Sequence, residues 1–238
     1  MRNTIFALAG LVGAIGIMGC GIQGTGGGDE PEVAPAFPEG TGQPSPAQVA
    51  YPAGPYGVGI NSVVANYKFV GYPNSLKVND VMNEIQLAAF YNPTGEGVYP
   101  EGSTVGEAGT PLPKALLIVV SAVWCGPCNF EADETLPKLY LEYKPLGGEF
   151  FLTLADGPTA GKAATSKSLY NWTKKYAVDY PSTIDPTYKL GALFEADAYP
   201  ANMIIDTRTM KIVEVISGAP EEGGSFWKTY EKVLAGTN

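Results

Sequence analysis

The sequence predicts an α/β domain in which helices cover a buried β-sheet. Three observations predict it: apolar strand-like runs alternate with helix-like segments, one run is apolar without interruption, and 45% of the 238 residues are hydrophobic. That apolar content is enough for a sizeable core. A chain of this length fits one domain with appendages, because a single core commonly serves about 100 to 200 residues.

The N-terminus has the features of an export signal. Arg2 precedes an uncharged, mostly apolar run from Asn3 to Met18, which is shorter than the roughly 20 apolar residues that span a bilayer. Residues 17–20, IMGC, resemble the lipobox of bacterial lipoproteins, which implies removal of residues 1–19 and lipidation of Cys20. An ordinary cleaved signal with an incidental cysteine is the alternative.

Residues 20–50 are predicted to form a flexible linker, because they contain mainly glycine, proline and acidic residues with little to bury. The folded domain is expected over residues 51–238. Within it, residues 51–114 alternate short apolar runs with turn signals, which predicts edge strands or hairpins joined by long loops. Six tyrosines of this segment are expected to pack rather than to line a ligand site: Tyr51, Tyr56, Tyr67, Tyr72, Tyr91 and Tyr99.

A continuous apolar run, ALLIVVSA at 115–122, predicts a central strand. Such a run lacks the alternation of a half-exposed strand and is typical of a strand buried on both faces. A helix is expected over residues 128–143. Pro137 must kink or divide that helix, because proline lacks the backbone N–H and its ring clashes with the preceding turn.

The remaining segments continue the alternation of strands and helices. EFFLTLA at 149–155 predicts a second strand, and SKSLYNWTKKYAV at 166–178 predicts a helix. NMIID at 202–206 and KIVEVI at 211–216 are separated by a turn and predict a hairpin. A closing helix is expected over residues 225–234. Its apolar face would consist of Phe226, Tyr230, Val233 and Leu234.

Composition excludes several classes of function. The formal net charge of −9 repels phosphate backbones, so nucleic acid is not expected as a partner. The absence of histidine excludes Ser/His/Asp catalysis, and no glycine-rich phosphate loop is present. Zinc requires four nitrogen or sulfur ligands, which a single cysteine pair does not supply. We therefore expect neither a metal nor another cofactor.

The candidate reactive groups are two cysteines in VWCGPCNFEAD, residues 123–133. Cys125 follows the predicted central strand, and Cys128 begins the expected helix. Unpaired N–H groups at a helix N-terminus favour a thiolate, and in such motifs the pKa of the first thiol falls to roughly 3.5 to 7.5. Cys125 would attack a partner's disulfide, and Cys128 would then resolve the mixed disulfide. An inert buried pair is the alternative.

Residues beside the cysteines are expected to serve the same exchange. Pro127 would keep the loop stiff, and Gly126 would leave room for a partner's backbone. Trp124 would shield the sulfurs and offer an apolar contact, with a purely structural role as the alternative.

WCGPC after a buried strand resembles thioredoxin. The signal, the linker and the segment DYPSTIDPTYKLGALFEADAYPANMIID at 179–206 are similar to membrane-anchored thiol-disulfide oxidoreductases of the TlpA/ResA type, and the similarity spans roughly residues 58–234. The resemblance implies a thioredoxin-like fold, with a central mixed β-sheet flanked by helices and an N-terminal strand or hairpin extension. It also implies protein-disulfide oxidoreductase activity.

The resemblance implies roles for three further residues. Pro200 matches the family's cis-proline, and Tyr199 before it would contact an incoming chain whose backbone pairs there. An ordinary loop proline is the alternative. Glu131 matches a glutamate that manages the proton of the buried cysteine, which would require a raised pKa; a solvated glutamate is the alternative. Val119 departs from thioredoxin, which has a buried aspartate at that position.

Together these features predict a reductase of envelope protein disulfides, lipid-anchored and facing the periplasm. Gly21 is not an obvious inner-membrane retention signal, which favours the outer membrane. A membrane protein is expected as electron donor, because no soluble cofactor site is evident. CGPC favours a reducing potential: the thioredoxin couple lies near about −270 mV and the strong periplasmic oxidant near about −120 mV. A disulfide oxidase or isomerase, and a copper-delivery protein of similar fold, are the alternatives.

Overall fold

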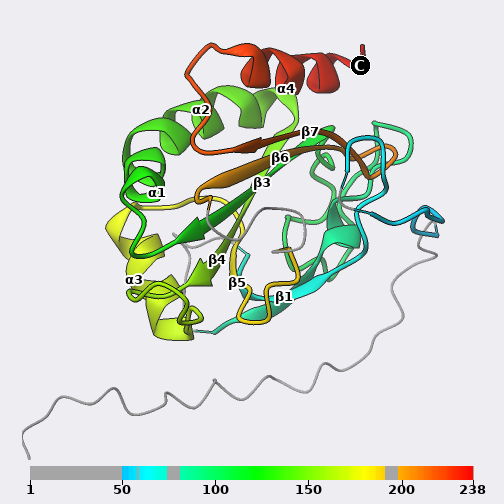
Figure 1. The fold of residues 1–238 in the computed structure, drawn as a ribbon. Coiled ribbons are helices and arrows are strands. Elements are labelled where there is room, and N and C mark those ends of the chain that lie inside the picture. Colours follow the sequence, from blue (N-terminus) through cyan, green and yellow to red (C-terminus); the bar gives the residue numbers. More distant parts are fainter. Residues whose placement is uncertain (1–49, 58, 74–80, 191–197, 238) are drawn as a thin grey trace, which may run out of the picture. The chain divides into compact units, whose positions relative to one another are not determined.

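The computed structural model describes residues 50–57, 59–73, 81–190 and 198–237. These residues form one seven-stranded mixed sheet in the order β2-β1-β5-β4-β3-β6-β7 (Figure 1). The predicted α/β class is therefore confirmed. The predicted signal peptide, Cys20 and nearly all of the predicted linker lie outside the described residues and stay predictions.

Three parallel strands form the centre of the sheet. β3 (Ala115–Ala122) pairs with β4 (Gly148–Asp156), and β4 pairs with β5 (Ser182–Ile184). Every residue of β3 and β4 is buried, as the continuous apolar run of β3 predicts. β5 was not among the strands predicted from hydrophobic pattern, because three residues are too few to show a period.

Antiparallel strands complete the sheet on both sides. β6 (Ala201–Asp206) lies beside β3 and forms the predicted hairpin with β7 (Lys211–Ser217). On the other side, β1 (Lys68–Tyr72) pairs with β5 and with the edge strand β2 (Asn83–Gln86). The hairpin extension expected within residues 51–114 is thus part of the central sheet.

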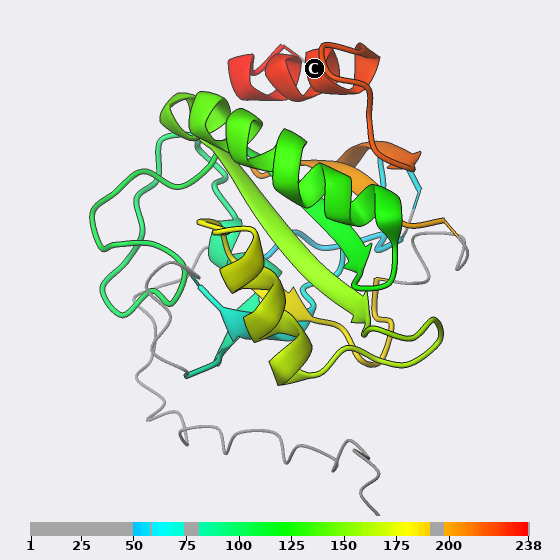
Figure 2. The same cartoon turned by 90° about the vertical axis from the view of Figure 1, so that its left-hand side faces the viewer.

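The described α-helices pack on one face of the sheet, where Figure 2 shows α2 and α3 in front of β4. The core on this face joins Leu117 and Val119 of β3 to side chains of every one of these helices, among them Trp172 and Tyr230. The helices are α1 (Gly126–Phe130), α2 (Leu136–Tyr143), α3 (Ser166–Lys175) and α4 (Ser225–Ala235). None of the helices in the described ranges is long and apolar enough to cross a membrane.

The opposite face is covered by the segment that precedes β3. Leu116, Ile118 and Val120 of β3 pack there against residues of that segment, including the short 3-10 helix η2 (Leu87–Phe90). Phe69 and Phe90 contact the ring of Phe151 at centroid distances of 5.5 and 5.8 Å. Of the six tyrosines expected to pack, Tyr56 is the exposed exception; Tyr51, Tyr67, Tyr72, Tyr91 and Tyr99 lie in or against the two cores.

The helix after the cysteines is interrupted, as Pro137 predicts, but the interruption lies before the proline. α1 begins at Gly126, two residues earlier than expected, and a π-helical segment, η3 (Glu131–Thr135), separates it from α2. Pro137 offers no N–H to the carbonyl four residues back, and its ring would clash there. A wider π turn relieves both problems. A 3-10 turn, η4 (Lys144–Leu146), ends the helical run.

The later helices agree with the sequence apart from one end. α3 begins at Ser166 behind the N-cap Thr165, whose hydroxyl accepts a hydrogen bond from the N–H of Ser168 at 3.2 Å. It ends at Lys175 rather than at residue 178, because Ala177 adopts a positive φ of 47°. The predicted apolar face of α4 is buried, with Trp227 added to it.

Candidate active site

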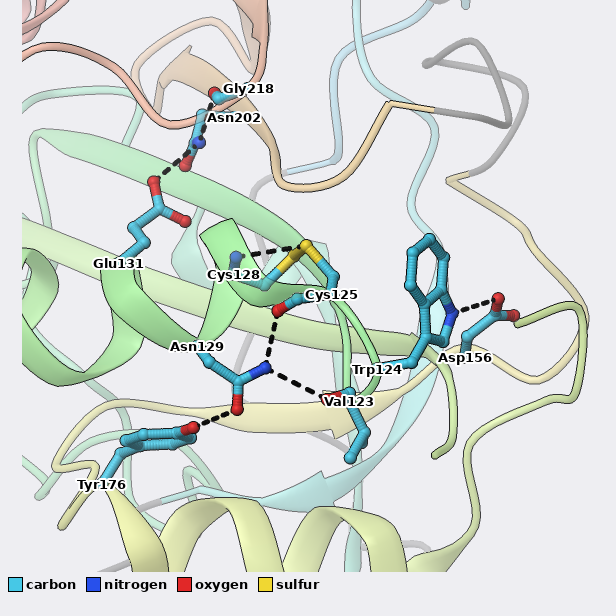
Figure 3. Close-up of a disulfide and its surroundings, with 10 residues drawn as sticks. All are labelled: Val123, Trp124, Cys125, Cys128, Asn129, Glu131, Asp156, Tyr176, Asn202 and Gly218. Carbon is cyan, nitrogen blue, oxygen red and sulfur yellow. Dashed lines mark hydrogen bonds between the residues drawn. A yellow bond between two sulfur atoms is a disulfide. The ribbon is translucent and has the colours of Figure 1, made fainter. Parts of the chain in front are cut away.

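Cys125 and Cys128 form a disulfide at the start of α1 (Figure 3). Cys125 is the N-cap residue, and its Sγ accepts a hydrogen bond from the backbone N–H of Cys128 at 3.1 Å. Gly126 and Pro127 are the first residues of the helix. The N–H groups at a helix N-terminus stabilise negative charge. After reduction this geometry therefore favours the thiolate of Cys125, as the sequence predicts.

Access to the two cysteines differs. Cys125 is 2% exposed and Cys128 is fully buried in the core on the helical face. Trp124 and Gly126, the neighbours of Cys125, are exposed. Cys125 is thus the cysteine that lies between exposed residues, which is consistent with its expected role as the attacking cysteine.

The residues expected to bind a partner come together at this end of the sheet. β6 starts opposite the end of β3, with Ala201 paired to Val120, which places Pro200 beside the CGPC loop. The Tyr199–Pro200 peptide bond is cis, as the resemblance predicts. The rings of Tyr199 and Trp124 meet edge to face at 5.9 Å, and Trp124 is 43% exposed.

Asp156, which sequence reasoning did not select, holds Trp124 in place. Its Oδ2 accepts hydrogen bonds from the indole N–H of Trp124 at 2.9 Å and from the N–H of Gly161 at 2.8 Å. Its Oδ1 accepts one from the hydroxyl of Tyr188. Asp156 ends β4 opposite the last residue of β3. An acidic residue at the end of a predicted strand was the signal that could have identified it.

Asn129, the residue after the second cysteine, was also missed. Its amide nitrogen donates to the carbonyls of Cys125 at 2.6 Å and Val123 at 3.1 Å (Figure 3). Its amide oxygen accepts from the hydroxyl of Tyr176 and from Lys175, both at the end of α3. Asn129 thereby ties the cysteine loop to α3. No sequence signal pointed to it, because its partners are distant along the chain.

Glu131 is fully buried at the start of the π segment, so it is not a solvated glutamate. Burial raises the pKa of its carboxyl to about 8, although a hydrogen bond from Asn202 acts in the opposite direction. That bond joins Asn202 Nδ2 to Glu131 Oε1 at 2.9 Å. The expected raised pKa is thus present. Asn202 was not selected from the sequence.

A metal site was also considered for the described residues. No cluster of three or more histidine, cysteine, aspartate or glutamate side chains placed to hold an ion occurs among those residues.

Comparisons with known proteins agree with this geometry. No family model matches the sequence. The thiol-disulfide oxidoreductase ResA of Bacillus cereus is 29% identical over 105 residues, which are 44% of this chain and 56% of the relative. The chain therefore matches little more than half of that relative's length.

Solved structures extend the comparison to the fold. A protein assigned as thiol:disulfide interchange protein DsbE from Chlorobium tepidum superposes with a TM-score of 0.53 at 14% identity, over 75% of this chain and 99% of the other. A protein assigned as a protein disulfide isomerase from Bacteroides thetaiotaomicron gives 0.51 at 21% identity, over 77% and 94%.

The chain has a thioredoxin-like fold. The expected resemblance to thiol-disulfide oxidoreductases is confirmed by the curated relative. In this thioredoxin-like domain, three parts of the chain converge on the disulfide: the end of β3 with Trp124, the start of α1, and the cis-proline before β6. The buried carboxyl of Glu131 lies one helical turn after Cys128. Such an arrangement can exchange a disulfide with a partner and accept the proton that the exchange releases.

Proposed function

We propose that this chain is a thiol-disulfide oxidoreductase that reduces disulfides of proteins in the bacterial cell envelope. The observation that carries the proposal is the Cys125–Cys128 disulfide at the start of a helix that follows a buried central strand. The similarity to ResA of Bacillus cereus supports the same chemical class. In the reduced protein, the two thiols supply the two electrons that a partner's disulfide takes up.

The exchange proceeds in two steps. The Cys125 thiolate attacks one sulfur of the partner's disulfide, a mixed disulfide forms, and the partner's other sulfur leaves as a thiolate that takes a proton from solvent. Cys128 then gives its proton to the carboxylate of Glu131 and attacks the Cys125 sulfur. The bond between Cys125 and the partner breaks, and the second partner sulfur leaves. The protein now holds the disulfide that the structure contains.

Trp124, Tyr199 and Pro200 are proposed to bind the partner. The exposed Trp124 and the half-buried Tyr199 form an aromatic edge beside Cys125, which suits an apolar side chain next to the partner's cysteine. The backbone before β6 is proposed to pair with an extended partner segment.

The proposal also covers the location of the protein and the source of the electrons that reduce its disulfide. The export signal and the lipobox-like residues 17–20 support a lipid anchor on Cys20 and a site facing the periplasm, with the outer membrane favoured. Reduction of the disulfide in each cycle requires a dithiol donor, for which we propose a membrane protein. The negative net charge does not favour nucleic acid as a partner.

Trapping of the mixed disulfide tests the proposed function. A Cys128→Ser variant keeps the attacking thiol and lacks the resolving one, so it should accumulate mixed disulfides on Cys125 that mass spectrometry identifies. Cys125→Ser is the matched control and should trap nothing. Equal amounts of trapped protein on the two variants, or none on either, would refute the proposal.

The direction of transfer is decided by the reduction potential. A reductase should equilibrate with glutathione or dithiothreitol buffers near the thioredoxin value of about −270 mV. A potential near about −120 mV would instead assign the chain to the disulfide oxidases, and strong refolding of scrambled disulfides would assign it to the isomerases.

A further inference from the structure

The buried carboxyl of Glu131 has two unlike oxygens. Oε1 accepts the hydrogen bond from Asn202 Nδ2 at 2.9 Å, while Oε2 has no hydrogen-bond partner among the described residues. Figure 3 shows Oε1 turned toward Asn202 and the second oxygen on the side of Cys128. An N–H donor binds an unprotonated oxygen, so a proton carried by this carboxyl sits on Oε2.

The orientation of the Asn202 amide is fixed by a second contact. The same Nδ2 lies 3.4 Å from the carbonyl oxygen of Gly218, and a carbonyl can only accept. Turning the amide over would set its oxygen against that carbonyl. The donor therefore faces Glu131, whichever protonation state the carboxyl adopts.

Asn202 also connects Glu131 to the segment proposed to bind a partner. It lies on β6 two residues after Pro200, and the carbonyl of Pro200 accepts a hydrogen bond from the N–H of Gly218 at 2.6 Å. Gly218 thus contacts both Pro200 and Asn202. The site of partner binding and the carboxyl are linked through one backbone residue and one side chain.

We propose that Asn202 is a positioning residue for the resolving step, because it holds Oε1 so that Glu131 exchanges the proton of Cys128 at Oε2. The proposal rests on the proposed function. When Cys128 attacks the Cys125 sulfur, its proton passes to Oε2 of the ionised carboxyl, and the partner's sulfur leaves with the electron pair of the broken bond. The hydrogen bond to Oε1 stabilises the ionised carboxyl before the transfer and so keeps it available as a base.

Among the described residues, two titratable groups near Glu131 are identified. After reduction of the disulfide, the thiol of Cys128 lies one helical turn before Glu131 (Figure 3), and Tyr180, in the segment before β5, is close enough for Glu131 to affect its pKa. The Tyr180 hydroxyl is buried without a hydrogen-bond partner among the described residues, and its pKa is raised first by burial and then by Glu131. Tyr180 therefore keeps its proton throughout the range in which Glu131 titrates, so it does not replace Asn202 in the proposal.

Asn202→Leu removes the donor at similar size and provides the test. Loss of one hydrogen bond to a charged group should raise the titration midpoint of the Glu131 carboxyl from about 8 by about one pH unit. This midpoint is measured by 13C NMR of the labelled carboxyl in the full chain. The rate at which a mixed disulfide with a small aromatic thiol is resolved should fall about tenfold at pH 7, with its acid limb shifted by the same amount. Asn202→Asp should shift the midpoint further, because it sets a second carboxylate beside the first.

Controls separate positioning from stability. In a Glu131→Gln background, Asn202→Leu should not change how the rate of mixed-disulfide resolution depends on pH, because the carboxyl that Asn202 contacts is absent. Asn92 is another buried asparagine, bonded to the carbonyls of Leu112 and Pro113, and Asn92→Leu should lower stability without moving the Glu131 midpoint. An unmoved midpoint in both Asn202→Leu and Asn202→Asp would overturn the proposal. The NMR midpoint decides this even if the wild type reduces no disulfide, an outcome that would refute only the proposed function.

Discussion

At Glu131, folding and the proposed disulfide exchange depend on the same proton. The carboxyl is buried and its pKa is raised from 4.5 to about 8. Below pH 4.5 the carboxyl is neutral in both the folded and the unfolded chain, so its burial does not lower the unfolding free energy through ionisation. Between pH 4.5 and pH 8 the unfolded chain loses the proton that the folded chain keeps, so stability falls as pH rises. Each pH unit in this interval corresponds to about 1.4 kcal/mol.

The first prediction at the scale of residues concerns this loss. Glu131→Gln removes the ionisation, so the unfolding free energy of the variant relative to wild type should rise by about 3 to 4 kcal/mol between pH 5 and pH 8. Urea unfolding at several pH values measures it. Glu134→Gln changes an exposed position in the same segment and should not reproduce this trend. A difference between Glu131→Gln and wild type that is constant with pH would contradict the prediction.

Some residues of the site could be predicted from the sequence, and the residues that orient them could not. The cysteines and Trp124 could be predicted because they lie within one short motif at the end of a buried strand. Glu131 and Pro200 could be predicted because the residues around them resemble a known family. The partners that orient these groups lie far away: Trp124 and Asp156 are 32 residues apart, and Glu131 and Asn202 are 71 apart. Only the pairing of β3 with β4 and β6 brings them together.

Among the elements, the interrupted helix is the one that most directly shapes the site. α1 supplies the end that faces Cys125, and the π segment carries Glu131 into the core toward β6. π turns are uncommon and often occur at functional sites, because they re-aim the side chains around them. Here the interruption sits directly after the cysteine pair.

The second prediction concerns α3, whose first turn is closed by Thr165. The Thr165 side chain and the Ser168 side chain bond to each other's backbone N–H groups at 3.2 and 3.3 Å. Thr165→Ala removes this capping box and should cost about 1 kcal/mol of unfolding free energy. Chemical denaturation measures the loss. Thr165→Ser keeps the hydroxyl and should restore most of it, and equal stabilities of the Ala and Ser variants would contradict the capping role.

Elements with a long, regular pattern were predicted to within three residues at either end. The differences that remain have physical reasons. β5 is too short to show a period, α3 stops where Ala177 leaves helical backbone angles, and the π turn requires one more residue than an α-helix offers. Each depends on local geometry that a periodic pattern does not record.

At the scale of the described domain, the two faces of the sheet are covered in different ways. All described α-helices lie on one face, and on the other the segment before β3 supplies the covering side chains. Right-handed connections from β3 to β4 and from β4 to β5 run in the same direction across the sheet, which places α1, α2 and α3 on the same side. The segment before β3 is therefore a required half of the core.

The third prediction follows from this division. A variant that lacks residues 1–113 would expose Leu116, Ile118 and Phe151, which are fully buried. Each such side chain contributes about 1.5 to 3 kcal/mol to the unfolding free energy when it is buried. The loss of several would therefore be comparable to the whole unfolding free energy of a domain. We expect that variant not to unfold cooperatively when heated, as followed by circular dichroism. A variant that lacks only residues 1–49 is the control and should unfold in one transition.

The fold class was predictable from the order of strands and helices, and the resemblance around WCGPC placed the site in it. How the second face is covered was not predictable. Residues 51–114 contain many glycines, prolines and tyrosines in short runs, and their packing on Phe151 depends on contacts more than 60 residues apart. A pattern of local alternation identifies strands there without showing what they cover.

The π turn after α1 also makes chain length a determinant of the site. A relative with one residue fewer between positions 131 and 135 would complete this turn as ordinary α-helix and keep Leu136 on its buried face, because a π turn takes up about one residue more than an α turn. The same deletion in an uninterrupted α-helix would rotate everything after it by about 100° about the helix axis. Gaps in this short stretch are therefore more informative than substitutions when distant relatives are aligned.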